Sequence, residues 1–293
     1  MTSIEWTDRT WNVVTGCTPI SSGCKNCYAE GIAKRFWGDR KFSDVQFHED
    51  RLLQPLSWKK PQKIFVNSMS DLFHEKVTDE QLDRIFAVMA LAHWQTFQVL
   101  TKRPQRALDY LSARNVSFRI ARAAWYIKPH TIPSELQERI KPHLPNVWLG
   151  VTCENQKTAN ERIPLLINTP AAVRFLSCEP LLEKINIQKF FPTYSADEGT
   201  CGYEPNQPIS WVIIGGESGH NARICHIDWI RSIVSQCQAA DVQAFVKQLG
   251  SSPLQSQKTE TGFTTSDIRL KNRKGGDTEE FPDDLKIREF PEN

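Results

Sequence analysis

The chain has 293 residues, 40% of them hydrophobic and 24% charged, which suits a globular protein with one large α/β domain or two ordinary ones. Its formal net charge of +2 is too small to indicate a nucleic-acid binder by itself. No apolar run approaches the ~20 residues that cross a bilayer, and no signal peptide is visible, so we expect a cytoplasmic protein with no membrane contact.

The expected strands are short apolar runs separated by helical patterns. Such runs are typical of strands buried on both faces of a parallel sheet. After a weaker run at 11–15, they lie at 64–66, 97–100, 147–151, 173–176, 211–214 and 244–246. Helix starts are indicated by a capping box from Thr78 to Gln81, by Pro104 and by Asp228 as an N-cap. This alternation predicts an α/β fold, a partial (β/α) barrel of about six or seven parallel strands or an open doubly wound sheet.

Three segments interrupt the alternation. Residues 113–146 are rich in basic and aromatic side chains and prolines, and residues 192–209 are rich in Gly, Pro and polar groups. Both are expected to be insertions in a domain spanning 1–249. Residues 250–293 lack apolar periodicity and are expected to form an irregular C-terminal tail. Because this tail leaves the end of the last strand, it is predicted to cap the barrel mouth, whereas 113–146 is not.

Cys17, Cys24 and Cys27 are the strongest chemical signal, three of eight cysteines within a short segment. Clustered thiolates in a reducing compartment favour a metal over disulfides. A structural zinc site needs four ligands, whereas a [4Fe–4S] cluster on three cysteines leaves one iron open. The alternative is a zinc knuckle completed by a distant cysteine, with Cys153, Cys178 and Cys225 as candidates.

Polar residues follow each strong strand directly. The ends of parallel strands share one face of such a fold, where α/β proteins build their sites. The candidate site residues on this face are Ser68, Ser70, Asp71, Lys102, Arg103, Glu154, Asn155, Glu179, Glu217 and Lys247.

Several segments also carry a family resemblance that covers most of the chain. They include Ile4-Glu5-Trp6-Thr7, the cysteine loop from Gly16 to Glu30, and the segments 67–74, 100–104, 148–155, 174–181 and 215–219. On these segments the chain resembles a phage- and prophage-associated family of unknown function, named after two phage gene products and regarded as radical-SAM-like. The first two cysteines stand further apart than in ordinary radical SAM enzymes.

The resemblance implies an enzyme in which Cys17, Cys24 and Cys27 bind a [4Fe–4S] cluster. The cluster would cleave S-adenosylmethionine (SAM) to a 5′-deoxyadenosyl radical, with electrons from a donor such as flavodoxin or ferredoxin. By the chemistry of SAM, Asp71, Ser68 or Ser70 would receive its ammonium, Lys102 or Arg103 its carboxylate, and Glu154 or Asn155 its ribose.

The expected substrate class is a nucleic acid or a nucleotide. The competing hypothesis is a zinc-stabilised nucleic-acid-binding or phage–host interaction protein without radical chemistry. For that function, Arg114, Phe118, Arg119, Arg122, Trp125 and Tyr126 would supply a basic and aromatic surface.

Overall fold

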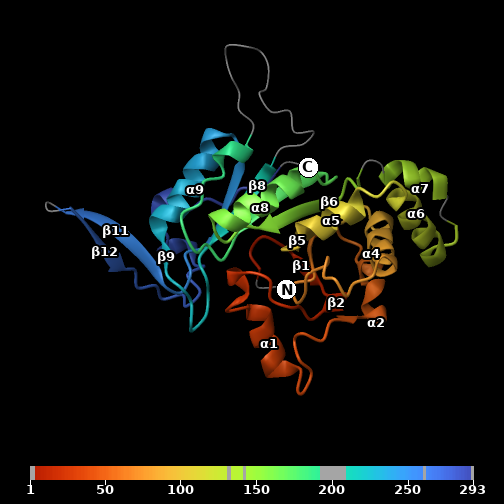
Figure 1. Ribbon diagram of the computed structural model, residues 1–293, viewed down its shortest axis with the longest axis horizontal. Coiled ribbons are helices and arrows are strands. Elements are labelled where there is room, and N and C mark those ends of the chain that lie inside the picture. Colours follow the sequence, from red (N-terminus) through yellow and green to blue (C-terminus); the bar gives the residue numbers. More distant parts are fainter. Residues whose placement is uncertain (1–3, 131–132, 141–142, 192–208, 260–261, 292–293) are drawn as a thin grey trace, which may run out of the picture. The chain divides into compact units, whose positions relative to one another are not determined.

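The computed structural model describes residues 4–130, 133–140, 143–191, 209–259 and 262–291 (Figure 1). The chain divides into two compact units. Unit 1 holds the described residues of 1–20, 27–151 and 168–173, and unit 2 those of 21–26, 152–167 and 174–293. The main sheet has seven strands in the order β1-β4-β5-β6-β7-β8-β10. The predicted α/β class with about six or seven parallel strands, a partial (β/α) barrel, is confirmed.

Unit 1 supplies the first four strands of this order, and the pairs β1–β4, β4–β5 and β5–β6 are parallel. Its elements are β1 (Arg9–Trp11), β2 (Val14–Thr15), α1 (Tyr28–Phe36), β3 (Gln46–Phe47), α2 (Glu49–Leu52), α3 (Gln54–Ser57), β4 (Lys63–Val66), α4 (Asp79–Leu91), β5 (Thr96–Thr101), α5 (Pro104–Leu111), α6 (Val116–Ile127), α7 (Pro133–Ile140) and β6 (Val147–Thr152).

Local sequence signals account for several of these elements. Thr78 and Gln81 form the predicted capping box, and α4 then buries Leu82 and Ile85 completely. The weak apolar run at 11–15 includes the last residue of β1 and all of β2. Strand β1 joins the main sheet, whereas β2 pairs with β3 in a separate antiparallel pair.

The described residues of 113–146 are largely helical, because they contain α6 and α7. Arg119 of α6 donates to Asp83 of α4 at 3.2 Å, and Tyr110 donates to the same carboxylate at 2.9 Å. Figure 1 shows α6 and α7 beside α4. This segment is therefore a helical layer of unit 1.

Unit 2 supplies the remaining strands of the sheet, with parallel pairs β7–β8 and β8–β10. Its elements are α8 (Gln156–Ile167), β7 (Val173–Cys178), β8 (Ile209–Gly215), β9 (Cys225–His226), α9 (Ile227–Ala239), β10 (Gln243–Gln248), β11 (Pro253–Thr259) and β12 (Gly262–Asp267). The N-cap of α9 is His226, so the N-cap predicted at Asp228 is wrong, and Asp228 lies in the first turn. Of the predicted insertion at 192–209, all but Ile209 lies outside the described residues.

The C-terminal segment is more regular than its sequence predicts. Strands β11 and β12 form an antiparallel hairpin, and β11 also pairs with β9 (Figure 1). The expectation of an irregular tail is therefore wrong for β11 and β12; beyond them the described residues contain two short 3-10 helices, η3 (Thr278–Glu280) and η4 (Asp283–Leu285).

The end of the chain runs along β10. Val246 N donates to Ile287 O at 2.8 Å, and Glu289 N donates to Ala244 O at 3.0 Å. Leu285 is fully buried. The segment thus covers an exposed sheet edge and belongs to the core of unit 2. That residues 250–293 cap the barrel mouth, and that 113–146 do not, stays a prediction. Within the ranges described above, no helix has the length and apolarity to cross a membrane.

Candidate metal and cofactor site

The backbone that leads into Cys17 is fixed within unit 1. Gly16 follows β2 with φ of +97°, and a Cβ there would lie 2.4 Å from the carbonyl oxygen of Asp44, so only glycine fits. Gly16 N donates to Met69 O at 2.9 Å, and Cys17 N donates to Phe42 O at 2.8 Å. The position of Cys17 therefore depends on contacts with the segments after β4 and before β3.

Arg103 lies beside the Cys17 thiol. Its Nη1 is 3.6 Å from Cys17 Sγ and 3.3 Å from Asp71 Oδ2, and its Nη2 donates to Thr18 O at 3.1 Å. Burial acts to lower the pKa of Arg103, but the charges of Asp71 and Cys17 outweigh it and raise that pKa. A guanidinium in this place stabilises a thiolate, the form of cysteine that binds metals.

Asp71 holds Arg103 in this position. The carboxylate is 6% exposed and accepts hydrogen bonds from Thr101 Oγ1 at 2.7 Å, Lys102 N at 2.9 Å and Phe73 N at 3.0 Å. Asp71, Lys102 and Arg103, which the sequence predicts as site residues after two neighbouring strands, are thus brought together. Their contacts within unit 1 give Asp71 a positioning role toward Arg103.

The two predicted serines and Cys27 lie on neighbouring segments of unit 1. Ser70 Oγ donates to Gly16 O at 2.6 Å, and Ser68 O accepts a hydrogen bond of 2.7 Å from Tyr28 Oη. Cys27 is the N-cap residue of α1, where the helix dipole favours negative charge. Ser70 therefore fixes the residue before Cys17, and Ser68 anchors the residue after Cys27.

His74 supports the same region from below the surface. The side chain is fully buried, its Nε2 lies 2.9 Å from Thr18 Oγ1, and its Nδ1 accepts a hydrogen bond of 3.1 Å from Lys76 N. Burial, followed by the charge of Arg103, lowers the pKa of His74. By holding Thr18, the buried ring has a structural role next to Cys17.

Asn67 belongs to the segment 67–74 that carries the family resemblance, but it was not among the candidate site residues. It follows β4 with φ of 59°, and its Oδ1 accepts a hydrogen bond of 3.1 Å from Val14 N. Its Nδ2 is buried and has no hydrogen-bond partner in the described part of the chain. A strained residue with an orphaned donor at a strand end is typical of a functional position.

In unit 2, Glu154 anchors the segment that precedes Cys24. The side chain is fully buried, Oε1 accepts a 2.7 Å hydrogen bond from Ser21 Oγ, and Oε2 lies 3.1 Å from Arg162 Nη1. A Cβ on Gly23 would lie 2.4 Å from Glu154 Cγ, so this close approach requires glycine. Asn155, the next residue, is 3.4 Å from Ser22 Oγ through its Nδ2.

Glu217 and Arg223 hold the same segment from another strand end. Glu217 Oε2 accepts hydrogen bonds of 2.9 Å from Asn26 Nδ2 and from Arg223 Nε, and Arg223 Nη1 donates to Ser22 O at 2.9 Å. Burial raises the pKa of Glu217, but the hydrogen bonds from Arg223 and Asn26 outweigh it, and the pKa is lowered overall. Arg223 follows a glycine-rich turn without any periodic pattern, so no sequence signal indicated it.

The last two predicted residues pair with each other. Lys247 Nζ lies 2.7 Å and 2.9 Å from the two carboxylate oxygens of Glu179. Both side chains are mostly buried, so each charge compensates the other where little water can reach them.

The cysteines fall into two classes by burial. Cys17, Cys24 and Cys27 are half-buried thiols, whereas Cys153, Cys178, Cys225 and Cys237 are fully buried. Burial raises the pKa of Cys225 and of Cys237 to about 12, and raises that of Cys178 well above its ordinary value. Cys201 lies outside the described residues.

Cys17, Cys24 and Cys27 offer three thiols, one fewer than the four ligands that a structural zinc site normally has. Among the described residues no group of three or more His, Cys, Asp or Glu side chains is arranged to hold a metal ion. Cys17 and Cys27 belong to unit 1 and Cys24 to unit 2. The set of three cysteine ligands therefore remains a prediction, supported by the half-exposed thiols and by the contacts that position them.

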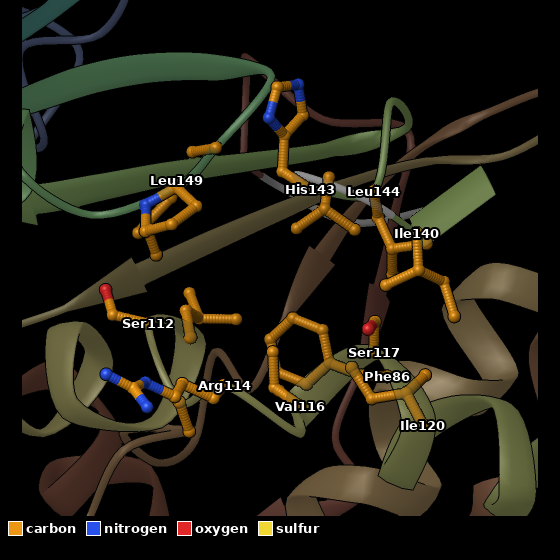
Figure 2. Close-up of a pocket in the computed structure, with 15 residues that line it drawn as sticks. Phe86, Ser112, Arg114, Val116, Ser117, Ile120, Ile140, His143, Leu144 and Leu149 are labelled. Carbon is orange, nitrogen blue, oxygen red and sulfur yellow. The ribbon is translucent and has the colours of Figure 1, made fainter. Parts of the chain in front are cut away.

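A cavity of about 320 Å³ lies elsewhere in unit 1 (Figure 2). Phe86, Ile120 and Leu149 contribute to its mostly apolar wall, and Arg114 and His143 also line it. It reaches the first residue of β6, whereas the predicted site residues follow the last residues of the strands. The cavity is therefore not part of the cysteine site.

Comparison with known proteins gives one match. A family model described as "Protein of unknown function (DUF5131)" matches residues 1–277. No curated protein and no solved structure matches the chain. The protein therefore belongs to the DUF5131 family.

Proposed function

We propose that this protein is a radical SAM enzyme whose Cys17, Cys24 and Cys27 bind a [4Fe–4S] cluster. The observation that carries the proposal is the contrast between these three half-exposed thiols and the four buried ones. When bound, the cluster would supply the electron that cleaves SAM to methionine and a 5′-deoxyadenosyl radical. The electron would come from a donor such as flavodoxin or ferredoxin.

The residues of the chain would hold and orient the ligands. In unit 1, Arg103 stabilises the Cys17 thiolate, and Asp71 keeps Arg103 in place. In unit 2, Glu154 and Glu217 bind Ser21 and Asn26, on either side of Cys24. These carboxylates already accept hydrogen bonds from the chain, so we assign them to positioning the cysteine segment.

Contacts with SAM are a separate part of the proposal. The residues proposed for it are Ser68, Ser70, Lys102, Asn155, Glu179 and Lys247. Lys102 is the first choice for the SAM carboxylate, since its backbone is fixed by Asp71 at 2.9 Å. Loss of SAM binding in Lys102→Ala with the cluster intact would support this contact, and unchanged SAM affinity would contradict it.

The test of the ligand assignment is metal analysis of anaerobically reconstituted full-length protein. Wild type should hold about four iron and four sulfide per chain. Alanine substitution of Cys17, Cys24 or Cys27 should abolish this loading, whereas Cys237→Ala is the matched control and should keep it. Equal loss in the Cys237 variant, or colourless wild type with stoichiometric zinc, would contradict the proposal.

The proposal also covers the cellular location, the origin and the substrate class of the enzyme. We propose a cytoplasmic, phage- or prophage-encoded protein whose substrate is a nucleic acid or a nucleotide. The seven described cysteines are thiols, which suits a reducing compartment. Cell fractionation tests the location, and recovery of the protein in a periplasmic or secreted fraction would contradict it.

A further inference from the structure

The outer face of α6 carries large side chains that point into solvent. Phe118 is 52% exposed, Trp125 41% and Tyr126 71%. The opposite face of the helix buries Ile120 and Ala124 against unit 1. Three exposed aromatic side chains on one helix are unusual for a surface without a binding partner.

One cation, Arg122, lies between these aromatic side chains, and Lys128 follows them at the C-cap of α6. Phe118, Arg122 and Tyr126 stand four residues apart, so they share one stripe of the helix. Arg122 and Lys128 are exposed and form no ion pair within the described residues. Arg119 is different, because it is bound to Asp83 at 3.2 Å and so belongs to the packing of the helix.

The charge of the segment is one-sided. No Asp or Glu occurs in the sequence between Asp109 and Glu135, a stretch that holds Arg122 of α6 and Lys128 at its C-cap. A polyanion is therefore the partner whose charge complements this face. Since the formal net charge of the whole chain is only +2, the positive charge between Asp109 and Glu135 is a local property of this segment.

We propose that the outer face of α6 binds single-stranded nucleic acid, with Phe118, Trp125 and Tyr126 stacking on bases and Arg122 and Lys128 contacting phosphates. Stacking on aromatic rings combined with basic contacts to the backbone is how proteins bind single strands without strong sequence preference. Phe118 and Tyr126 are separated by a helical rise of about 12 Å.

Other partners fit this stripe less well. A helix that lies on a membrane separates its apolar face from its cations, whereas here Arg122 stands between Phe118 and Tyr126. A second copy of the face would bring Arg122 and Lys128 of both chains together without an acidic residue of α6 to balance them. Binding of single-stranded nucleic acid to α6 does not require the cluster, so its test is independent of the proposed enzyme activity.

The test is fluorescence anisotropy of full-length protein with a labelled oligothymidylate of twelve nucleotides in 50 mM salt. Trp125→Ala combined with Tyr126→Ala should raise Kd at least tenfold, because each stacked base is lost. Arg122→Gln should lower the slope of log K against log salt by about 0.7, the share of one phosphate contact on a single strand. The controls are Phe36→Ala, an exposed aromatic side chain on α1, and Lys157→Gln, an exposed cation on α8.

All these positions are on the surface, so unchanged melting temperatures should show that the variants fold. Wild type that does not bind the oligonucleotide at 100 μM protein would overturn the proposal. Equal affinity of wild type and the double variant would overturn it as well. The double variant could also keep its oligonucleotide affinity but lose self-association, which would assign the face to a second copy of the chain. If it kept that affinity but lost binding to phosphatidylserine vesicles, the face would be assigned to a membrane.

Discussion

The contacts of Glu217 predict that a single substitution releases the segment around Cys24. The carboxylate accepts four hydrogen bonds, one from Asn26 and three from Arg223. Glu217→Gln keeps the size of the side chain but removes its charge. Because hydrogen bonds to charged groups contribute about 1.5–3 kcal/mol each and the amide keeps part of them, we expect the free energy of opening residues 21–26 to fall by about 2 kcal/mol.

Trypsin provides a local assay, because Lys25 lies exposed within this segment. When a segment recloses faster than it is cut, the cleavage rate follows the population of the open form. A loss of about 2 kcal/mol then corresponds to about thirtyfold faster cleavage after Lys25. Glu161→Gln, an exposed carboxylate of α8, is the matched control and should cleave like wild type. Equal cleavage of Glu217→Gln and wild type would refute the positioning role of Glu217.

Three further predictions concern stability. Burial lowers the pKa of His74, so as pH falls below about 6.5 the imidazole is protonated in the unfolded chain before it is protonated in the folded one. The urea midpoint of unfolding should therefore decrease from pH 7 to pH 5, and it should decrease less in His74→Gln. An equal decrease in wild type and variant would contradict this. Gly16→Ala should lower the free energy of unfolding by about 1–3 kcal/mol, because the added Cβ would clash with Asp44 O. Gly38→Ala is the control and should lower it less, since Gly38 also has a positive φ but has open space around it. Equal melting temperatures of the two variants would contradict the clash. Removal of residues 251–293 should unfold unit 2 and cause aggregation, and a truncated chain that melts like wild type would show that this segment is dispensable.

The strands and helices could be predicted where a local pattern decides the structure. Six apolar runs became β4, β5, β6, β7, β8 and β10 because strands buried on both faces need continuous apolar sequence. The hairpin of β11 and β12 could not be predicted, since Pro253–Thr259 is mostly polar and shows no apolar alternation. Its pairing comes from backbone hydrogen bonds to β12 and β9, which leave no trace in composition.

The candidate site, too, could be predicted from the sequence only in part. Strand ends could be identified from the sequence, so Asp71, Glu154 and Glu217 were found. Their partners could not be predicted, because Arg223 and Ser21 meet these carboxylates only through the tertiary fold. The difference between half-buried and buried cysteines is likewise a tertiary property, which spacing alone does not encode.

The central claim is tested most directly by the fate of SAM. Full-length protein, reconstituted with iron and sulfide and reduced with dithionite without oxygen, should convert SAM to 5′-deoxyadenosine, and Cys24→Ala treated identically should not. Wild type that binds stoichiometric zinc, or that holds the cluster but forms no 5′-deoxyadenosine, would contradict the account.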